Sequence, residues 1–320
     1  MNGTKRLNRG NRSVDVFVFD VTFAGPMFAP LLFYIFIFPI TLLPFRVIYA
    51  VSDGLYYIIY YLVRYRRKVV FENLRNSFPE KSEAEITKIA QGYYRHFCDL
   101  TVESFKMFSI TEEKLREIFI FKDKEILEQL FKQNRNVILA GGHYNNWEVF
   151  AVACKLGISH QCLALYKPLK NAWFDKKMRE SRGRFGLHMW PIKKAKEMFE
   201  QEANTLTAAI FGMDQSPSSA TQCHWMKFLN QETGVTFGAE RYARSNNSAV
   251  VYGRIIKIKR GHYSFEAELV SDSPNEEPMG KIIEKLTKLI EADIIKQPEY
   301  WLWSHKRWKR KRPVGQPIAA

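Results

Sequence analysis

The sequence predicts an α/β fold, a mostly parallel mixed sheet flanked by helices, with an N-terminal apolar membrane anchor in front of it. From residue 136 on, short runs of branched and aromatic residues alternate with stretches whose apolar residues recur at helical spacing, a pattern typical of strands connected by helices. Residues 21–45 contain no charged side chain. We therefore assign residues 1–63 to a membrane anchor or interfacial segment and residues 64–320 to one α/β domain.

The apolar segment near the N-terminus is long enough to cross a bilayer, because about 20 helical residues span a hydrocarbon core of ~30 Å. Its prolines favour another possibility, a helix broken into a tilted, re-entrant or interfacial piece: Pro26, Pro30, Pro39 and Pro44. A further apolar stretch, residues 47–63, is interfacial or forms the second arm of a hairpin. The basic run 64–68 that follows favours a cytoplasmic face for the domain.

The remaining segments alternate as an α/β fold requires. Residues 82–131 have apolar side chains at helical spacing and are expected to form a helical layer. The expected strands are residues 136–140, 161–166, 187–191, 205–211, 249–258 and 263–270, the last two joined by a turn at Arg260-Gly261-His262. Glu276-Glu277-Pro278 is expected to begin a final helix whose apolar residues between 282 and 290 line one face.

The charge balance favours an anionic partner. The chain of 320 residues carries 48 Lys and Arg against 33 Asp and Glu, a net charge of +15, which suits nucleic acid, anionic lipid or an acidic carrier protein. His188 and His224 lack partners at metal-ligand spacing, and there is no glycine-rich phosphate loop, so we expect neither a metal nor a nucleotide cofactor. No C-x-x-C pair occurs, and we expect four reduced, mostly buried cysteines: Cys98, Cys154, Cys162 and Cys223.

Residues 136–148 combine a strand, a tight turn and the start of a helix with chemically capable side chains. His143 lies at the mouth of this unit, and Glu148 follows about one helical turn further on. A neutral imidazole can take a proton from an alcohol that attacks a carbonyl, provided that a carboxylate fixes its tautomer and stabilises the imidazolium. We therefore predict His143 as general base and Glu148 as its orienting partner. Gly141 and Gly142 would bring backbone amides close to a developing oxyanion.

The nucleophile is expected to come from the substrate. The chain contains no G-x-S-x-G elbow, and no Ser, Cys or Thr lies between His143 and Glu148, so a substrate hydroxyl would attack directly. A structural alternative stays open. Asn145 as helix N-cap with Glu148 as its return partner would form a variant of the capping box, which requires no catalysis.

The order of motifs resembles a known family. Gly142-His143-Tyr144-Asn145-Asn146-Trp147-Glu148 is similar to the G-H-(aromatic)-G-N-W-E block of the bacterial lipid A late acyltransferases, the lauroyl and myristoyl type within the lysophospholipid acyltransferase superfamily. Further blocks follow in that family's order: Tyr166-Lys167-Pro168-Leu169-Lys170-Asn171, Arg182-Gly183-Arg184-Phe185-Gly186, Asp214-Gln215-Ser216-Pro217, and the closing run from Pro298 to Trp308 with Trp301 and Trp303. Upstream, Arg66-Arg67 and Glu72-Asn73-Leu74-Arg75-Asn76-Ser77-Phe78-Pro79 resemble its R-R-x-x-x-x-N-L-x-x-x-F-P-E stretch, so the resemblance runs from about residue 55 to the end.

The resemblance implies an O-acyltransferase at the cell inner membrane with its catalytic domain on the cytoplasmic face. The donor would be a fatty acyl thioester on acyl carrier protein, with acyl-CoA as the other possibility, and the acceptor would be a hydroxyl of a lipid A precursor. Neither a cofactor nor nucleic acid is implied. The resemblance places the following residues in substrate binding: Gly142, Asn146, Lys167, Arg182, Arg184 and Asp214.

Two residues depart from the family pattern, and several keep a second interpretation. Asn145 replaces the glycine usual in the first block, and Lys167 stands where Arg is common, which replaces a bidentate fork with a point charge. By spacing alone, Arg182 and Arg184 could instead solvate a helix end. Asp214 either binds a sugar or orients a basic residue, or simply forms a turn.

Two other functions stay open from the sequence. The same chemistry could act on a lysophospholipid or another amphiphile. The basic, tryptophan-containing tail 306–312 would also suit a non-catalytic protein that binds a membrane surface or nucleic acid, although the apolar N-terminus favours the membrane.

Overall fold

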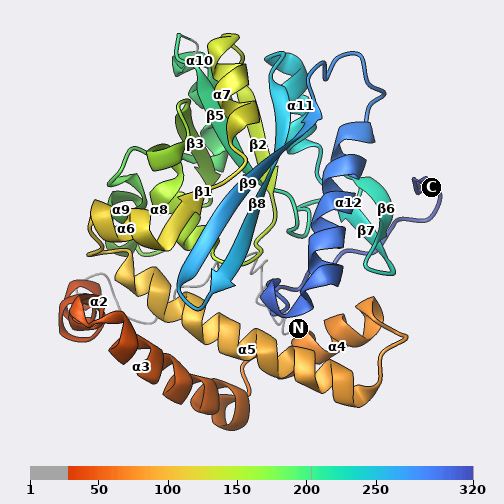
Figure 1. Cartoon of the computed structure of the whole chain (residues 1–320). Coiled ribbons are helices and arrows are strands. Elements are labelled where there is room, and N and C mark those ends of the chain that lie inside the picture. Colours follow the sequence, from red (N-terminus) through yellow and green to blue (C-terminus); the bar gives the residue numbers. More distant parts are fainter. Residues whose placement is uncertain (1–27, 203, 320) are drawn as a thin grey trace, which may run out of the picture.

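Seven strands form one sheet with helices packed against it (Figure 1). The computed structural model describes residues 28–202 and 204–319, and within them the strand order is β1-β9-β8-β2-β5-β3-β4. The strands are β1 Phe119–Phe121, β2 Val137–Gly141, β3 Gln161–Tyr166, β4 His188–Pro191, β5 Thr207–Gly212, β8 Ala249–Lys259 and β9 His262–Ser271. All neighbouring pairs are parallel except β8 and β9, which confirms the predicted mostly parallel mixed sheet.

The helices alternate with the strands as expected, with two differences: one expected helical layer contains a strand, and the last helix begins later than expected. They are α1 Ala29–Leu32, α2 Phe38–Leu42, α3 Phe45–Tyr57, α4 Arg67–Ser77, α5 Glu83–Lys106, α6 Glu112–Ile118, α7 Glu125–Lys132, α8 Trp147–Gly157, α9 Ala172–Gly183, α10 Ala195–Gln201, α11 Gly238–Ser245 and α12 Lys281–Lys296. The layer expected over residues 82–131 is α5, α6 and α7, interrupted by the unpredicted β1. α12 begins later than residue 276 because Gly280 has a φ of 95°, outside the right-handed helical region.

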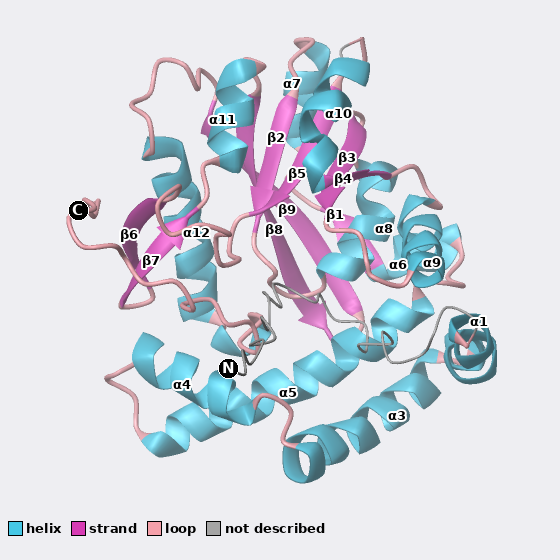
Figure 2. Cartoon of the chain, turned by 180° about the vertical axis from the view of Figure 1, so that it is seen from behind, coloured by secondary structure: helices cyan, strands magenta, loops and turns pink. Residues whose placement is uncertain are grey.

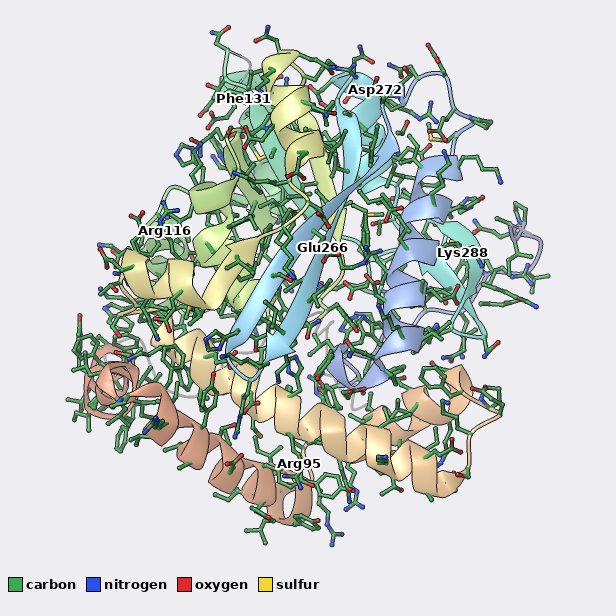
Figure 3. All side chains as sticks on the ribbon, in the orientation of Figure 1. Arg95, Arg116, Phe131, Glu266, Asp272 and Lys288 are labelled. Atoms are coloured by element: carbon green, nitrogen blue, oxygen red, sulfur yellow. The ribbon has the colours of Figure 1, made fainter. Side chains whose placement is uncertain are left out.

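Alternate residues of the central strand β2 face two separate cores. Ile138 and Ala140 pack with buried residues of α5, α11 and α12, whereas Val137 and Leu139 pack with buried residues of α6, α7 and α8. Successive side chains of a strand point to opposite faces, so a continuously apolar strand is the pattern expected between two helical layers. Figure 3 shows side chains filling the space between the sheet and these helices. β2 therefore lies at the centre of the fold, between the two cores.

A small hairpin lies outside the main sheet, beside α12 (Figure 1). Its strands are β6 His224–Phe228 and β7 Gln231–Val235, and its turn residues Leu229 and Asn230 both have positive φ, 49° and 60°. Leucine is an unusual residue at such a position, so the turn carried no glycine signal and the hairpin was missed. The C-terminal segment packs along it: Arg312 pairs with Glu232 at 2.9 Å.

Residues 28–63 form a helical layer on the side of α5 that faces away from the sheet (Figure 2). The π-helical segment Phe33–Ile37 (η2) joins α1 to α2, Leu43 and Pro44 separate α2 from α3, and α3 continues into Ile58–Val63 (η3). α3 packs on α5, where the Ser52 hydroxyl donates to Asp99 at 2.8 Å and the Arg95 guanidinium lies 4.3 Å from the centre of the Tyr56 ring (Figure 3).

None of the helices in the described ranges combines the length and the apolar character that crossing a bilayer requires. The spanning segment expected over residues 21–45 lies partly outside those ranges. In its described part, Pro30 and Pro39 are the second residues of α1 and α2, and the helical backbone is interrupted at Leu43 and Pro44, the N-cap of α3.

Candidate active site

The sheet brings His143 and Asp214 together. β2 and β5 are neighbours in parallel register, with Gly141 paired to Gly212 at their carboxyl ends. His143 and Asp214 each follow closely after these glycines, at the edge where sites of α/β proteins gather. The imidazole Nδ1 lies 2.7 Å from Asp214 Oδ1, and the backbone N–H of His143 donates to Asp214 Oδ2 at 2.7 Å. Asp214 therefore holds both the ring and the backbone of His143.

A third donor reaches the same carboxylate from the C-terminal segment. The indole Nε1–H of Trp301 donates to Asp214 Oδ2 at 2.7 Å. Burial alone would raise the pKa of Asp214, but the charge and hydrogen bonds of His143 together with the Trp301 bond outweigh it and lower the pKa to about 2. Asp214 is thus a buried carboxylate that stays ionised.

His143 is arranged as a base. Burial would lower its pKa, but the charge of Asp214 and its hydrogen bond to the ring outweigh burial, and the net direction is upward from 6.5. Because Nδ1 faces a carboxylate, it carries the proton of the neutral ring, and Nε2 presents the lone pair. The amide nitrogen of Gln215 lies 3.1 Å from that Nε2. The ring also packs edge-on against Trp147, with centroids 5.2 Å apart.

Glu148 is not placed as the sequence led us to expect. Its carboxylate forms a bidentate ion pair with Arg182, at 2.7 and 3.0 Å, and both side chains are largely buried. The reason is the backbone between the two predicted partners: Asn145 has a φ of 55°, so His143 lies before the helix and not one turn along it. In the described structure the carboxylate bonded to His143 is Asp214, and Glu148 acts on the ring through its charge, which raises the His143 pKa.

The two asparagines divide the tasks of turn and cap. Asn145 adopts the left-handed conformation that glycine takes readily and asparagine tolerates, which explains why it can replace the family's usual glycine. The helix N-cap is Asn146 and not Asn145, since the side-chain oxygen Oδ1 of Asn146 accepts the N–H of Val149 at 3.0 Å. The Asn146 amide also donates to the buried carboxylate of Glu103. Asn146 therefore links the start of α8 to Glu103 on α5.

Two glycines allow the close approach of Asp214 and His143. A Cβ on Gly142 would lie 3.3 Å from Asp214 Oδ2, and one on Gly212 would lie 2.7 Å from Cε1 of His143. The expected oxyanion donors are only partly available, because the His143 N–H is already bonded to Asp214. The role of Gly142 in the described structure is to leave room for the Asp214 carboxylate next to His143.

The basic residues separate into two groups. Arg182 is held near the site by Glu148, whereas Arg184 donates to the carbonyl of Met107 at 3.3 Å and stacks on Phe185, so the structure does not bring it to His143. Lys167, Lys309 and Arg310 form a second group, because burial, followed by the charges of Arg310 and Lys167, lowers the pKa of Lys309.

The C-terminal segment contributes residues that were not singled out as site residues. His305 Nε2 accepts the backbone N–H of Ser216 at 3.0 Å, and burial lowers the His305 pKa to about 3, so this ring is a neutral acceptor. Asn73 donates to the carbonyls of Trp303 and His305 at 2.8 and 3.0 Å. The conspicuous tryptophans and the Asp-Gln-Ser-Pro run were the available signals, but only the fold shows that they meet.

Comparisons with a family pattern and with individual proteins point to the same group of proteins. The sequence pattern of the family described as bacterial lipid A biosynthesis acyltransferase matches residues 20–310. The lipid A biosynthesis palmitoleoyltransferase of Escherichia coli (strain K12) is 23% identical over 265 residues, covering 78% of this chain and 81% of that protein. The lipid A biosynthesis lauroyltransferase of the same organism is 22% identical over 277 residues, covering 86% and 89%, and the lipid A biosynthesis acyltransferase of Haemophilus influenzae is 21% identical over 279, covering 86% and 88%.

Proposed function

The chain belongs to the bacterial lipid A biosynthesis acyltransferase family, and on that premise we propose that this O-acyltransferase moves a fatty acyl chain from an acyl carrier protein thioester to a hydroxyl of a lipid A precursor. His143 is the general base. Asp214 is its orienting partner, in the role first expected of Glu148. The observation that carries this proposal is the 2.7 Å bond from His143 Nδ1 to Asp214, which leaves Nε2 as the proton acceptor.

The reaction needs one base and no protein nucleophile. Nε2 of His143 takes the hydroxyl proton as the acceptor oxygen attacks the thioester carbonyl, and a C–O bond forms. The tetrahedral intermediate then collapses, the C–S bond breaks, and the thiolate receives the proton from Nε2. The imidazolium exists only between these steps. A carboxylate whose pKa is lowered to about 2 stays charged throughout and stabilises it.

The acceptor's anionic groups suit the cluster of Lys167, Lys309 and Arg310. Arg310 donates to the carbonyl of Ser218, in the loop that begins at Asp214 and Gln215, so the cluster borders the catalytic loop. Arg182 suits this task less well, because Glu148 already neutralises it in a bidentate pair. We therefore assign phosphate binding to the cluster, and we assign to Arg182 the role of holding the first turn of α8 through Glu148.

Location at the cytoplasmic face of the inner membrane draws support from the layer 28–63. Large apolar side chains stay exposed there, among them Phe36 at 62%, Leu62 at 77% and Val63 at 63%. So many large apolar side chains exposed within one segment are unusual on a protein that contacts only water. The basic residues Arg64 and Lys68 follow at its edge, where they suit anionic headgroups. The interfacial alternative for this segment is the one we adopt.

Transfer assays on the purified protein test the proposal. His143→Ala should reduce transfer from acyl carrier protein thioester to lipid A precursor by at least ~10²-fold, as for loss of a positioned base. The matched control is His188→Ala, on the edge strand β4, which should keep turnover. Near-wild-type transfer by His143→Ala would contradict the base assignment. Replacing the donor by acyl-CoA, and the acceptor by a lysophospholipid, separates the narrower substrate proposal from its alternatives.

A further inference from the structure

We propose that the side chain of Gln215 masks the proton-accepting nitrogen of His143 until an acceptor hydroxyl displaces it, and thereby suppresses hydrolysis of the acyl donor. The inference rests on the proposed function, since it takes His143 as the base. An acyltransferase that works with a thioester and an open base must keep water from taking the place of the acceptor. The geometry around Nε2 points to a residue that does so.

The contact of Gln215 with His143 has one consistent hydrogen-bond assignment. Nδ1 of the ring faces the Asp214 carboxylate at 2.7 Å and carries the proton, so Nε2 can only accept. The Gln215 amide nitrogen lies 3.1 Å from Nε2 and is a donor. The lone pair that should receive the substrate proton is therefore occupied by the Gln215 amide.

Hydrogen bonds hold the residues on both sides of Gln215, whereas the Gln215 side chain is partly open to solvent. On one side, Asp214 is held by His143 and Trp301. On the other, the N–H of Ser216 donates to His305 at 3.0 Å. Gln215 is itself half-buried. Rotation of its side chain alone can therefore uncover Nε2 without moving the catalytic pair.

The mask decides which oxygen attacks. If water reaches Nε2, the base takes a proton from water, the water oxygen bonds the acyl carbon, the C–S bond breaks and the thiolate takes the proton, which releases a free fatty acid. A bound acceptor places its hydroxyl at Nε2 with the help of all its other contacts, so it can displace the amide. A single water molecule has no such additional binding.

The test measures hydrolysis without acceptor. Gln215→Met keeps a side chain of similar length but removes the donor, so release of free fatty acid from acyl carrier protein thioester should rise by roughly three- to tenfold over wild type. In the double variant with His143→Ala the rate should return to background, because water attack runs through the base. Gln201→Met, on the exposed end of α10, is the matched control. Unchanged hydrolysis in Gln215→Met would overturn the proposal.

A second measurement does not depend on activity. Diethyl pyrocarbonate modifies the lone-pair nitrogen of imidazole, and mass spectrometry of peptides gives a rate for each histidine. His143 should react several-fold faster in Gln215→Met than in wild type, relative to His262 in the same sample. Equal rates would show that Nε2 is not masked. If His143→Ala keeps full transfer, the proposed function fails; if transfer needs His143 while hydrolysis and modification ignore Gln215, only the mask fails.

Discussion

Two buried carboxylates lie on either side of the segment 143–146, and their surroundings differ. Asp214 faces the imidazole of His143 and the indole of Trp301, and its pKa is lowered to about 2. Glu103, on α5, accepts the hydroxyls of Tyr49 and Tyr263, each at 2.7 Å, and the amide of Asn146. Burial raises the pKa of Glu103, and the hydrogen bond from Tyr49 only partly opposes this.

The comparison teaches that the partners of a buried carboxylate, and not its burial, decide its charge. Asp214 gains a charged partner whenever His143 takes a proton, which is the condition for stabilising an imidazolium. Glu103 has neutral donors from three elements, since Tyr49 belongs to α3, Tyr263 to β9, and Asn146 caps α8. Asp214 is thus suited to stabilising a protonated His143. Glu103 suits fastening the outer helix α3 and the segment 143–146 to one point.

The largest expected effect tests which carboxylate orients the base. Asp214→Asn removes the acceptor for Nδ1–H and favours the wrong tautomer, so turnover should fall on the order of 10³-fold with the fold retained. Steady-state kinetics and circular dichroism together measure this.

Glu148→Gln is the matched variant, because it changes the carboxylate that the sequence first suggested. Its loss of turnover should be smaller than that of Asp214→Asn, although Arg182 is left buried without its full partner and stability should fall. The reverse ranking of the two turnover losses would restore Glu148 as the orienting residue.

Glu103→Gln should affect stability more than chemistry. The amide can keep its oxygen for Tyr49 at the Oε1 position, but its NH₂ then faces the Tyr263 hydroxyl and the NH₂ of Asn146, which both donate to Oε2. Unfolding free energy should therefore fall by about 1–3 kcal/mol. Denaturant titration measures the change. A loss of turnover as large as that of Asp214→Asn, at unchanged stability, would show that the two carboxylates do not divide the work as described.

The two carboxylate centres should appear in different pH measurements: the Asp214–His143 pair in the reaction rate and Glu103 in the unfolding free energy. His143 must be neutral to act, and its pKa is raised, so the rate should fall about tenfold per pH unit below a midpoint above 6.5. Because the charge of Glu148 contributes to that increase, Glu148→Gln should move the midpoint down. A midpoint that stays fixed or rises in this variant would argue that Glu148 exerts no charge effect on the ring.

Glu103 should instead influence stability. Its pKa is raised in the folded state, so the protonated form favours folding, and its contribution is fully present below about pH 4.3 and is lost as pH rises through the folded pKa. Glu103→Gln should flatten the dependence of unfolding free energy on pH in this window. An unaltered slope would mean that Glu103 titrates as it does in the unfolded chain.

The smallest expected effect concerns exposed lysines of the tail 306–312. Arg310 and Arg312 are engaged by Ser218 and Glu232, whereas Lys306 and Lys311 are exposed. Replacing Lys306 and Lys311 with Gln should weaken retention on anionic vesicles a few-fold at low salt, with the difference shrinking above ~0.1 M salt because exposed charges are screened. Vesicle sedimentation measures it, with duplex DNA as the comparison ligand. Loss of DNA binding alone would support the nucleic-acid alternative.

The sequence by itself determined the elements that local periodicity encodes. β3 was expected at residues 161–166 and occurs there, and the other predicted strands agree within a few residues. His143 was also found locally, because a strand, a glycine turn and a helix start surround it. The four cysteines are free and buried, as their spacing predicted. The hairpin of β6 and β7 was not predicted, because Leu229 stands at a turn position of positive φ where glycine or asparagine is usual.

Only the tertiary structure decided which carboxylate meets His143. The pattern offered Glu148, nearby in sequence, and Asp214 as one of several possibilities. Because β5 pairs directly with β2, it brings together two residues separated by 71 positions, and Trp301 joins them across a further 87. A positive φ at Asn145 turns Glu148 away toward Arg182. Strand order depends on contacts between residues far apart in the sequence, and the turn at Asn145 depends on one backbone conformation. Hydrophobic periodicity carries information about neither.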